Sequence, residues 1–271
     1  MTLRGVPPPV ANTLRALTIA LARLLGSNLH GIYVYGSLTQ AAFDRVRSDL
    51  DCLVVVRRHL TDAQLQRLRA WLAQAAIADP WMHRVQMQVL LRRRLLRSDA
   101  RGALYQFGIL TRSGSDGNPI AWMNVLATGI TLIGPSPQTF LPRITEEMVF
   151  AALVREVGYL RAEIVDPASE WRGQRFYRAY AVLTLCRILC THRTGEVASK
   201  PRAARWALRT LPERWHSLVQ AAIGARPGAL RPLPLPRIAR FIEFVAAQVA
   251  QPTTHTPKRR PNSRAGSSYP A

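Results

Sequence analysis

Two short apolar runs stand out in the first third of the chain. Residues 31–35 and 52–56 are unbroken, rich in β-branched side chains and bounded by polar segments, which is typical of buried strands. Apolar residues at helical spacing predict a helix over 10–25, and a capping box at 61–64 predicts a helix that begins there and runs to about residue 76. Partial alternation over 83–91 predicts a third strand that can pair with the first two.

Beyond the third predicted strand, helical spacing becomes more frequent along the chain. Residues 102–112 are predicted to form another strand or a short helix, and a loop is expected at 113–119. The remaining pattern predicts a helix at 120–129, a strand at 131–135, and helices at 145–165, 177–192, 201–211 and 235–251. We therefore expect an α+β protein with an α/β domain over 1–138 and a helical domain over 139–251. The basic segment 252–271, poor in apolar residues, is predicted to be disordered.

Two aspartates stand at the entrance of the second predicted strand. Asp49 and Asp51 flank one residue, so on a strand both side chains point to the same face. Two close carboxylates repel each other unless a cation lies between them, and hard oxygen ligands suit Mg²⁺. Gly36 and Ser37 follow the first strand and suit a turn at which backbone approaches a phosphate. The alternative is a hairpin with two solvated aspartates.

Composition narrows the cellular setting and leaves the partner open. No apolar run approaches the roughly 18 residues of a membrane span, and the start of the chain lacks the apolar core of a signal peptide. Three cysteines, an odd and sparse count, favour reduced thiols, so we expect a cytoplasmic protein, taken to be a monomer. The net charge of +21 indicates either an anionic partner such as a nucleotide or RNA, or a solvated basic surface.

The spacing of these motifs resembles that of a known superfamily. Glycine-serine, eleven residues and then Asp-x-Asp entering a strand is the pattern of the polymerase-β-like nucleotidyltransferases. Further stretches make residues 25 to 225 similar to the streptomycin/spectinomycin adenylyltransferases, namely 118–135, 183–187, 194–200 and 204–212. The resemblance implies a nucleotidyltransferase domain with a mixed sheet, followed by an all-α bundle. It implies an antibiotic-resistance enzyme that transfers AMP from ATP, with Mg²⁺, to a hydroxyl of an aminoglycoside bound between the domains.

The resemblance also implies roles for individual residues. Asp49 and Asp51 match the Mg²⁺ ligands of the family, Gly36 and Ser37 its phosphate-binding turn, and Lys200 a lysine that reaches the nucleotide phosphates. Lys200 is also the only lysine among the first 257 residues of an arginine-rich chain. A compact ammonium group at a phosphate would explain that choice, and a solvated lysine at a helix start is the alternative.

The chain departs from the family where the acceptor is activated. Gln86 stands where the family has a glutamate proposed as general base, and an amide cannot accept a proton. The candidates for a replacement are His83, Glu196 and Glu170, each with a structural or surface role as its alternative.

The acceptor-binding region departs as well. The segment 175–180, which supplies drug-binding acids in the family, carries Arg175 and Arg178, and like charge would weaken the binding of a cationic drug. The glycine pair that often follows Gly-Ser is replaced by Ala41 and Ala42. Nucleotide binding therefore looks better preserved than drug modification.

Two further hypotheses stay open at this point. The same chemistry could act on a protein, an RNA or an anionic metabolite, which Arg175 and Arg178 favour. The other hypothesis is a catalytically degenerate nucleotide- or RNA-binding protein, and Gln86 favours it. The aromatic residues are candidates for stacking on a base or sugar, with a place in the core as their alternative; they are Tyr105, Trp122, Trp171, Trp206 and Trp215.

Overall fold

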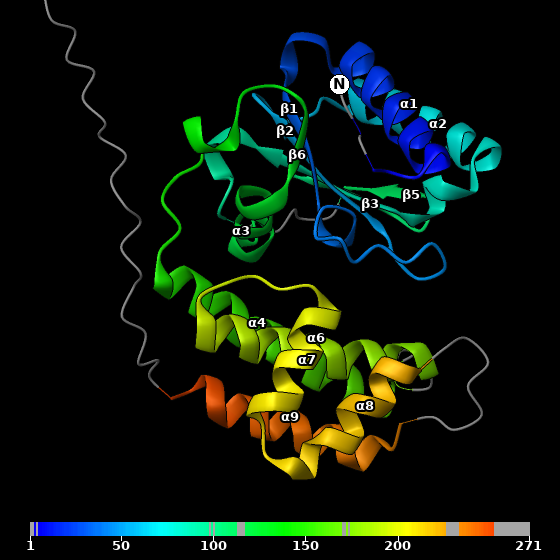
Figure 1. Cartoon of the computed structure of the whole chain (residues 1–271). Coiled ribbons are helices and arrows are strands. Elements are labelled where there is room, and N and C mark those ends of the chain that lie inside the picture. The colour runs from blue at the N-terminus through cyan, green and yellow to red at the C-terminus, as the bar shows by residue number, and fades with distance from the viewer. Residues whose placement is uncertain are drawn as a thin grey trace, which may run out of the picture.

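The computed structural model shows a sheet-containing half above a helical half (Figure 1). It describes residues 3, 5–97, 99, 101–112, 117–169, 172, 174–225 and 233–251. The segment 252–271, for which disorder is expected, lies outside the described residues. The predicted boundary at 138 falls in a single 3₁₀ turn, Pro137–Thr139, between the last strand and the first helix of the helical half.

The predicted α+β class with a mixed sheet is confirmed. Six strands follow the spatial order β5-β4-β3-β2-β1-β6, in which β2 and β3 are parallel and every other neighbouring pair is antiparallel. The strands are β1 Leu29–Tyr35, β2 Leu50–Val56, β3 Val85–Leu91, β4 Ala103–Gln106, β5 Ile109–Thr111 and β6 Ile130–Ile133.

Alternation along the two central strands builds a core on each face of the sheet. Val34 and Val54 point to the face that is covered by helices α1 (Pro8–Leu25) and α2 (Asp62–Ala78). Tyr33, Leu53 and Val55 point to the other face, where they pack with Trp122 and Val125 of helix α3 (Pro119–Thr128). Both faces are buried, which explains why these strands read as continuous apolar runs.

Polar residues set the starts of the helices next to the sheet. Thr61 and Gln64 form a reciprocal capping box at α2. Asn118 accepts a hydrogen bond from the Ile120 N–H at 2.9 Å and is followed by a proline at the first position of α3. These caps fix where α3 begins, and its start borders the cavity described below.

The helical half is built around α6 (Arg175–Thr194). This helix packs against all four of its neighbours and is buried on several sides, through residues such as Ala181, Leu185 and Cys186. The neighbours are α4 Glu146–Val165, α7 Lys200–Thr210, α8 His216–Gly224 and α9 Leu235–Val249.

Several expectations need correction or refinement. The stretch 102–112 forms a hairpin of two short strands, because Phe107 and Gly108 both have positive φ and make a turn. Helix α8 was not predicted, since it has only nine residues and no side-chain cap.

Most of the aromatic candidates belong to the core. Trp122, Trp215 and Tyr105 are buried, and Trp206 packs against the core of the helical half, while Trp171 lies outside the described residues. Within the described part of the chain, no helix is long and apolar enough to span a bilayer.

Candidate functional site

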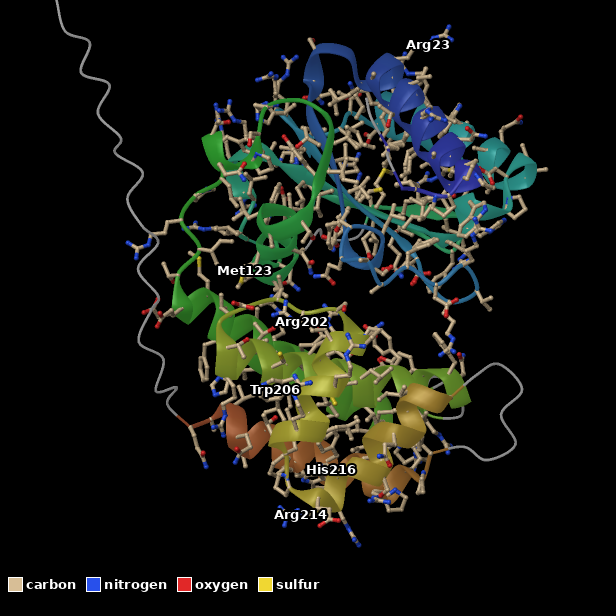
Figure 2. All side chains as sticks on the ribbon, in the orientation of Figure 1. Arg23, Met123, Arg202, Trp206, Arg214 and His216 are labelled. Carbon is tan, nitrogen blue, oxygen red and sulfur yellow. The ribbon has the colours of Figure 1, made fainter. Side chains whose placement is uncertain are left out.

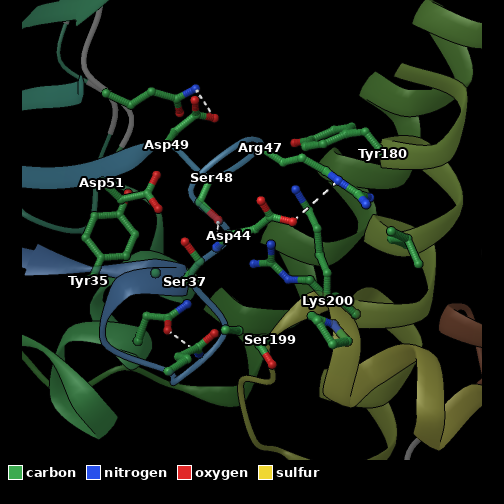
Figure 3. A pocket seen from close by; sticks show the side chains of 18 of the residues that line it. Tyr35, Ser37, Asp44, Arg47, Ser48, Asp49, Asp51, Tyr180, Ser199 and Lys200 are labelled. Atoms are coloured by element: carbon green, nitrogen blue, oxygen red, sulfur yellow. Dashed lines mark hydrogen bonds and ion pairs between the residues drawn. The ribbon is translucent and has the colours of Figure 1, made fainter. Parts of the chain in front are cut away.

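A cavity of about 370 Å³ opens between the two halves of the protein. Figure 3 shows side chains from both halves pointing into it. The sheet side contributes the turn after β1, the loop before β2 and the start of β2, together with residues of α3. The helical side contributes residues of α6, α7 and α8. Segments far apart in the sequence therefore share one cavity.

The aspartate pair lies at the entrance of β2, as the sequence predicts. Leu50 begins the strand and is fully buried, so Asp49 and Asp51 on either side of it both face the cavity. Burial and the nearby Asp49 charge raise the pKa of Asp51 to about 6, against the opposing effect of Lys200. Burial also raises the pKa of Asp49. The proximity of the two carboxylates is therefore unfavourable unless a cation lies between them.

A divalent cation with oxygen preference fits this pair. Among the described residues, no group of three or more His, Cys, Asp or Glu side chains could hold a metal. A closed zinc site would need about four protein ligands. Mg²⁺ usually takes one or two carboxylates and completes its shell with water and substrate phosphates. Asp49 and Asp51 suit that mode of binding.

Gly36 makes room for the aspartate pair. Its φ is +80°, and a Cβ atom placed on it would lie 2.0 Å from Oδ2 of Asp51. Its carbonyl accepts hydrogen bonds from the N–H groups of Thr39 at 3.2 Å and Gln40 at 3.1 Å, which close a tight turn around Ser37. Ser37 itself lines the cavity. Only glycine meets both demands, the positive φ and the close approach of the carboxylate.

Lys200 approaches the pair from the helical half. It is the first residue of α7, and its Nζ lies 4.1 Å from the centroid of the Tyr180 ring. Burial and the nearby Arg187 charge lower the pKa of Lys200 to about 8, against the opposing effect of Asp51. A partly buried ammonium group near two carboxylates and a second cation is suited to an anion that would enter between them.

Gln86 lies beside the aspartates on the neighbouring strand. In the parallel register of β2 and β3 it is the partner of Asp51, and its Nε2 donates a hydrogen bond to Oδ2 of Asp49 at 3.3 Å. The amide therefore orients Asp49 and adds no third negative charge. In this position it cannot remove a proton.

The two described candidates for a replacement base lie elsewhere. His83 was expected to begin a strand, but the chain stays in a 3₁₀ turn up to Arg84, so the exposed His83 ring lies against Gly108 and does not line the cavity. Glu196 is exposed and pairs with Arg202 at 2.8 Å. The third candidate, Glu170, lies outside the described residues.

The basic segment at the start of α6 is also placed differently from the expectation. The guanidinium of Arg178 donates to the carbonyls of Arg172 at 2.9 Å and Leu233 at 3.1 Å and does not line the cavity. The side chain of Arg175 lies outside the described residues. From this segment, the aromatic rings of Phe176 and Tyr180 reach the cavity.

Sequence reasoning missed several residues of the site. Arg187 on α6 lines the cavity, although its flanking residues Cys186 and Ile188 are buried, and an arginine within such an apolar helix was the available signal. Asp44 and Arg47 lie in the loop before β2, whose shape no local pattern specifies. Their arrangement depends on contacts made across the fold.

Comparisons with known proteins relate this chain to the adenylyltransferases. Residues 139–248 match the model of a protein family described as "Aminoglycoside adenylyltransferase, C-terminal domain". An aminoglycoside (3'') (9) adenylyltransferase of Rhizobium radiobacter is 29% identical over 124 residues, which are 44% of this chain and 43% of that protein. A spectinomycin 9-adenylyltransferase of Staphylococcus aureus is 25% identical over 220 residues, which are 73% of this chain and 78% of that protein.

The fold is also that of a solved structure. It is the spectinomycin adenyltransferase AAD(9) from Enterococcus faecialis, determined with ATP and spectinomycin. The two structures agree with a TM-score of 0.69 at 17% sequence identity, and the match covers 89% of this chain and 99% of that one.

Gly36→Ala tests the close packing of Asp51 against the turn. The new Cβ must displace the carboxylate, so we expect metal-dependent ATP binding to weaken by roughly tenfold or more, together with a loss of about 1–3 kcal/mol in unfolding free energy. Calorimetric titration and thermal unfolding measure the two effects.

Gly195→Ala is the matched control for backbone strain. Gly195 has a φ of +68° at the end of α6, and a Cβ there meets nothing within 4 Å. This variant should lose stability but keep its affinity for Mg-ATP. Equal affinity losses in both variants would contradict the role assigned to Gly36.

Proposed function

Since this chain belongs to the aminoglycoside adenylyltransferase family, we propose that it transfers AMP from ATP to a hydroxyl group of an aminoglycoside of the streptomycin/spectinomycin type. The observation that carries the proposal is the convergence of Asp49, Asp51 and Lys200 on one cavity from the two halves of the protein. The ATP and spectinomycin in the related Enterococcus structure support the same pair of substrates.

The nucleotide side of the proposed site is strongly charged. Ser37 and the turn that begins at Gly36 would contact the triphosphate, and Lys200 and Arg187 would bind it from the helical half. Asp49 and Asp51 would hold Mg²⁺, which, when bound, neutralises the charge that develops during phosphoryl transfer. The cations face the carboxylates across the cavity, so a metal-bound triphosphate would satisfy both.

The acceptor side is formed by apolar and aromatic residues of α6. Phe176, Tyr180 and Leu183 line this wall and could pack against the rings of an aminocyclitol. Closure between two halves of one chain would hold the acceptor hydroxyl near the α-phosphate and keep water away from it. This arrangement needs one chain only, which supports a monomer.

The biological setting follows from the same reaction. We propose that the protein confers resistance to the drug that it modifies. We place it in the cytoplasm, where ATP is available and thiols stay reduced, and its three cysteines are free in the structure.

A second candidate function is a nucleotide-binding protein without turnover. The observation in its favour is Gln86, whose amide donates to Asp49 where a base is expected. An acceptor of another class, a protein, an RNA or an anionic metabolite, loses part of its support because Arg178 is engaged away from the cavity.

Incubation with α-labelled ATP, Mg²⁺ and spectinomycin or streptomycin tests these functions. The proposed function requires pyrophosphate release together with a drug whose mass has increased by one AMP. Label on added RNA or on protein, with none on the drug, would move the activity to another acceptor. Binding of ATP without pyrophosphate release would support the second candidate.

Lys200→Ala should weaken ATP binding more than AMP binding, because the ammonium group would face the outer phosphates. We expect a loss of about 10- to 100-fold for ATP, the worth of one hydrogen bond to a charged group. AMP affinity should change little. Calorimetry with both nucleotides measures the difference, and equal losses would place the contact elsewhere.

The pH dependence of ATP binding gives a second check on Lys200. Its pKa of about 8 in the free protein means that the ammonium group is charged below pH 8 and neutral above it. Bound phosphates raise that pKa, so its contribution to affinity is full below pH 8 and is lost as the pH rises through the bound-state value. Lys200→Arg, whose guanidinium stays charged, should show a flatter profile.

Gln86→Glu should raise the rate of adenylyl transfer, since it places a carboxylate at the position of the family's base. A positioned base is worth about 10²- to 10⁴-fold in rate, which sets the upper limit of the gain. Single-turnover measurements at saturating Mg-ATP separate this gain from changes in binding. No gain, with ATP still bound, would direct attention to the acceptor wall.

A further inference from the structure

Transfer to a hydroxyl group requires a proton acceptor that Gln86 cannot be. Among the described residues that line the cavity, the carboxylates are Asp44, Asp49 and Asp51. The last two are committed to the cation in the proposed function. We propose that Asp44 is the general base of the adenylyl transfer, an inference that rests on the proposed function.

The loop before β2 orients the Asp44 side chain. Its Oδ1 accepts a hydrogen bond from the Val46 N–H at 2.8 Å, and its Oδ2 lies 3.5 Å from Nε of Arg47. Its own N–H donates to Oγ of Ser48 at 2.9 Å, and its carbonyl accepts from the Ser48 N–H at 2.8 Å. Figure 3 shows the carboxylate turned into the cavity and joined to Arg47. Turn and ion pair together limit the positions that the carboxylate can take.

Two arginines hold this loop against the rest of the protein. Arg47 donates through Nη1 to the carbonyl of Ala225 at 2.8 Å, which links the loop to the end of α8 in the helical half. Arg84 donates to the carbonyls of Arg45 and Ser48 and stacks on Trp81, with its guanidinium carbon 4.4 Å from the ring centroid. Asp44 therefore sits on a loop that is anchored on both sides of the cavity.

Asp44 is accessible enough to release its proton to water between reaction cycles. Its side chain is 46% exposed, whereas Asp51 is only partly exposed. Water can therefore carry away the proton that it receives. Asp44 also lines the same cavity as the aspartate pair, on the loop that leads into β2.

The proposed step needs no reactant beyond the two proposed substrates. A lone pair of the acceptor hydroxyl oxygen forms a bond to the α-phosphorus of ATP, and the bond from that phosphorus to the bridging oxygen of the β-phosphate breaks. The hydroxyl proton passes to the Asp44 carboxylate. Pyrophosphate leaves with the electron pair of the broken bond, and the drug carries the AMP group.

Asp44→Asn separates the chemical role from the structural one. An asparagine Oδ1 can still accept from the Val46 N–H, so the turn is kept while the base is lost. We expect kcat for drug adenylylation to fall by about 10²-fold or more. The KM for the drug and the Kd for Mg-ATP should stay within about twofold, and the pH profile of kcat should lose its acid limb.

Asp62→Asn is the control for the loss of one surface carboxylate. Asp62 opens α2, is highly exposed and pairs with Arg112 at 2.8 Å, on the sheet half and outside the cavity lining. This variant should keep the wild-type kcat. In the Asp44→Asn background, Gln86→Glu should recover more activity than it adds to the wild type, because one carboxylate then replaces the other.

Several results would overturn the assignment. An unchanged kcat in Asp44→Asn would do so, and so would a raised KM at constant kcat, which indicates that Asp44 binds an ammonium group of the drug. Loss of Mg-ATP binding in this variant would show that the loop depends on the charge for its structure. A wild-type protein that releases no pyrophosphate with any acceptor removes the proposed function itself, and the base with it.

Discussion

Repulsion between two neighbouring carboxylates at the start of β2 is the constraint on which the site depends. Burial raises the pKa of both Asp49 and Asp51, and three neighbouring residues accommodate the two carboxylates in different ways. Gly36 has no Cβ and lets the Asp51 carboxylate approach its backbone. Gln86 donates a hydrogen bond to Asp49 and brings no further charge. Lys200 supplies the opposite charge from another part of the chain. The site is thus organised around a carboxylate pair whose repulsion a divalent cation would relieve.

The two halves contribute different groups to the cavity. The sheet half carries the acids and the tight turn, because strand ends can place alternate side chains on one face with little freedom. The helical half carries the cations and the aromatic wall, and its central helix α6 holds Tyr180 and Arg187 on a rigid core. The loop of Asp44 and Arg47 joins the two. A substrate that contacts both halves therefore meets the acids of the sheet half and the cations Lys200 and Arg187 of the helical half.

The sequence predicted the parts of this architecture that local rules determine. Two unbroken apolar runs, a capping box and the Asp-x-Asp spacing located the central strands, α2 and the carboxylate pair. The roles given to Gly36, Ser37 and Lys200 stay predictions, although the structure brings these residues into one cavity. Contacts distant in sequence decide the rest. His83 lies outside the cavity because β3 begins two residues later than the alternation indicates. The Arg178 guanidinium donates hydrogen bonds to the carbonyls of Arg172 and Leu233. Asp44 lines the cavity on a loop that Arg47 of the loop itself and Arg84 of another segment anchor.

Calorimetric titration of Mg-ATP into the wild type, Asp49→Asn and Asp51→Asn tests the central claim most directly. Each variant replaces a charged ligand by a neutral isostere at a side chain that faces the cavity, so the fold should persist, which thermal unfolding can verify. The account predicts that Mg²⁺ strengthens ATP binding to the wild type and that this gain is lost in both variants. Unchanged Mg-ATP affinity in both variants would contradict it, because the carboxylate pair would then hold no metal.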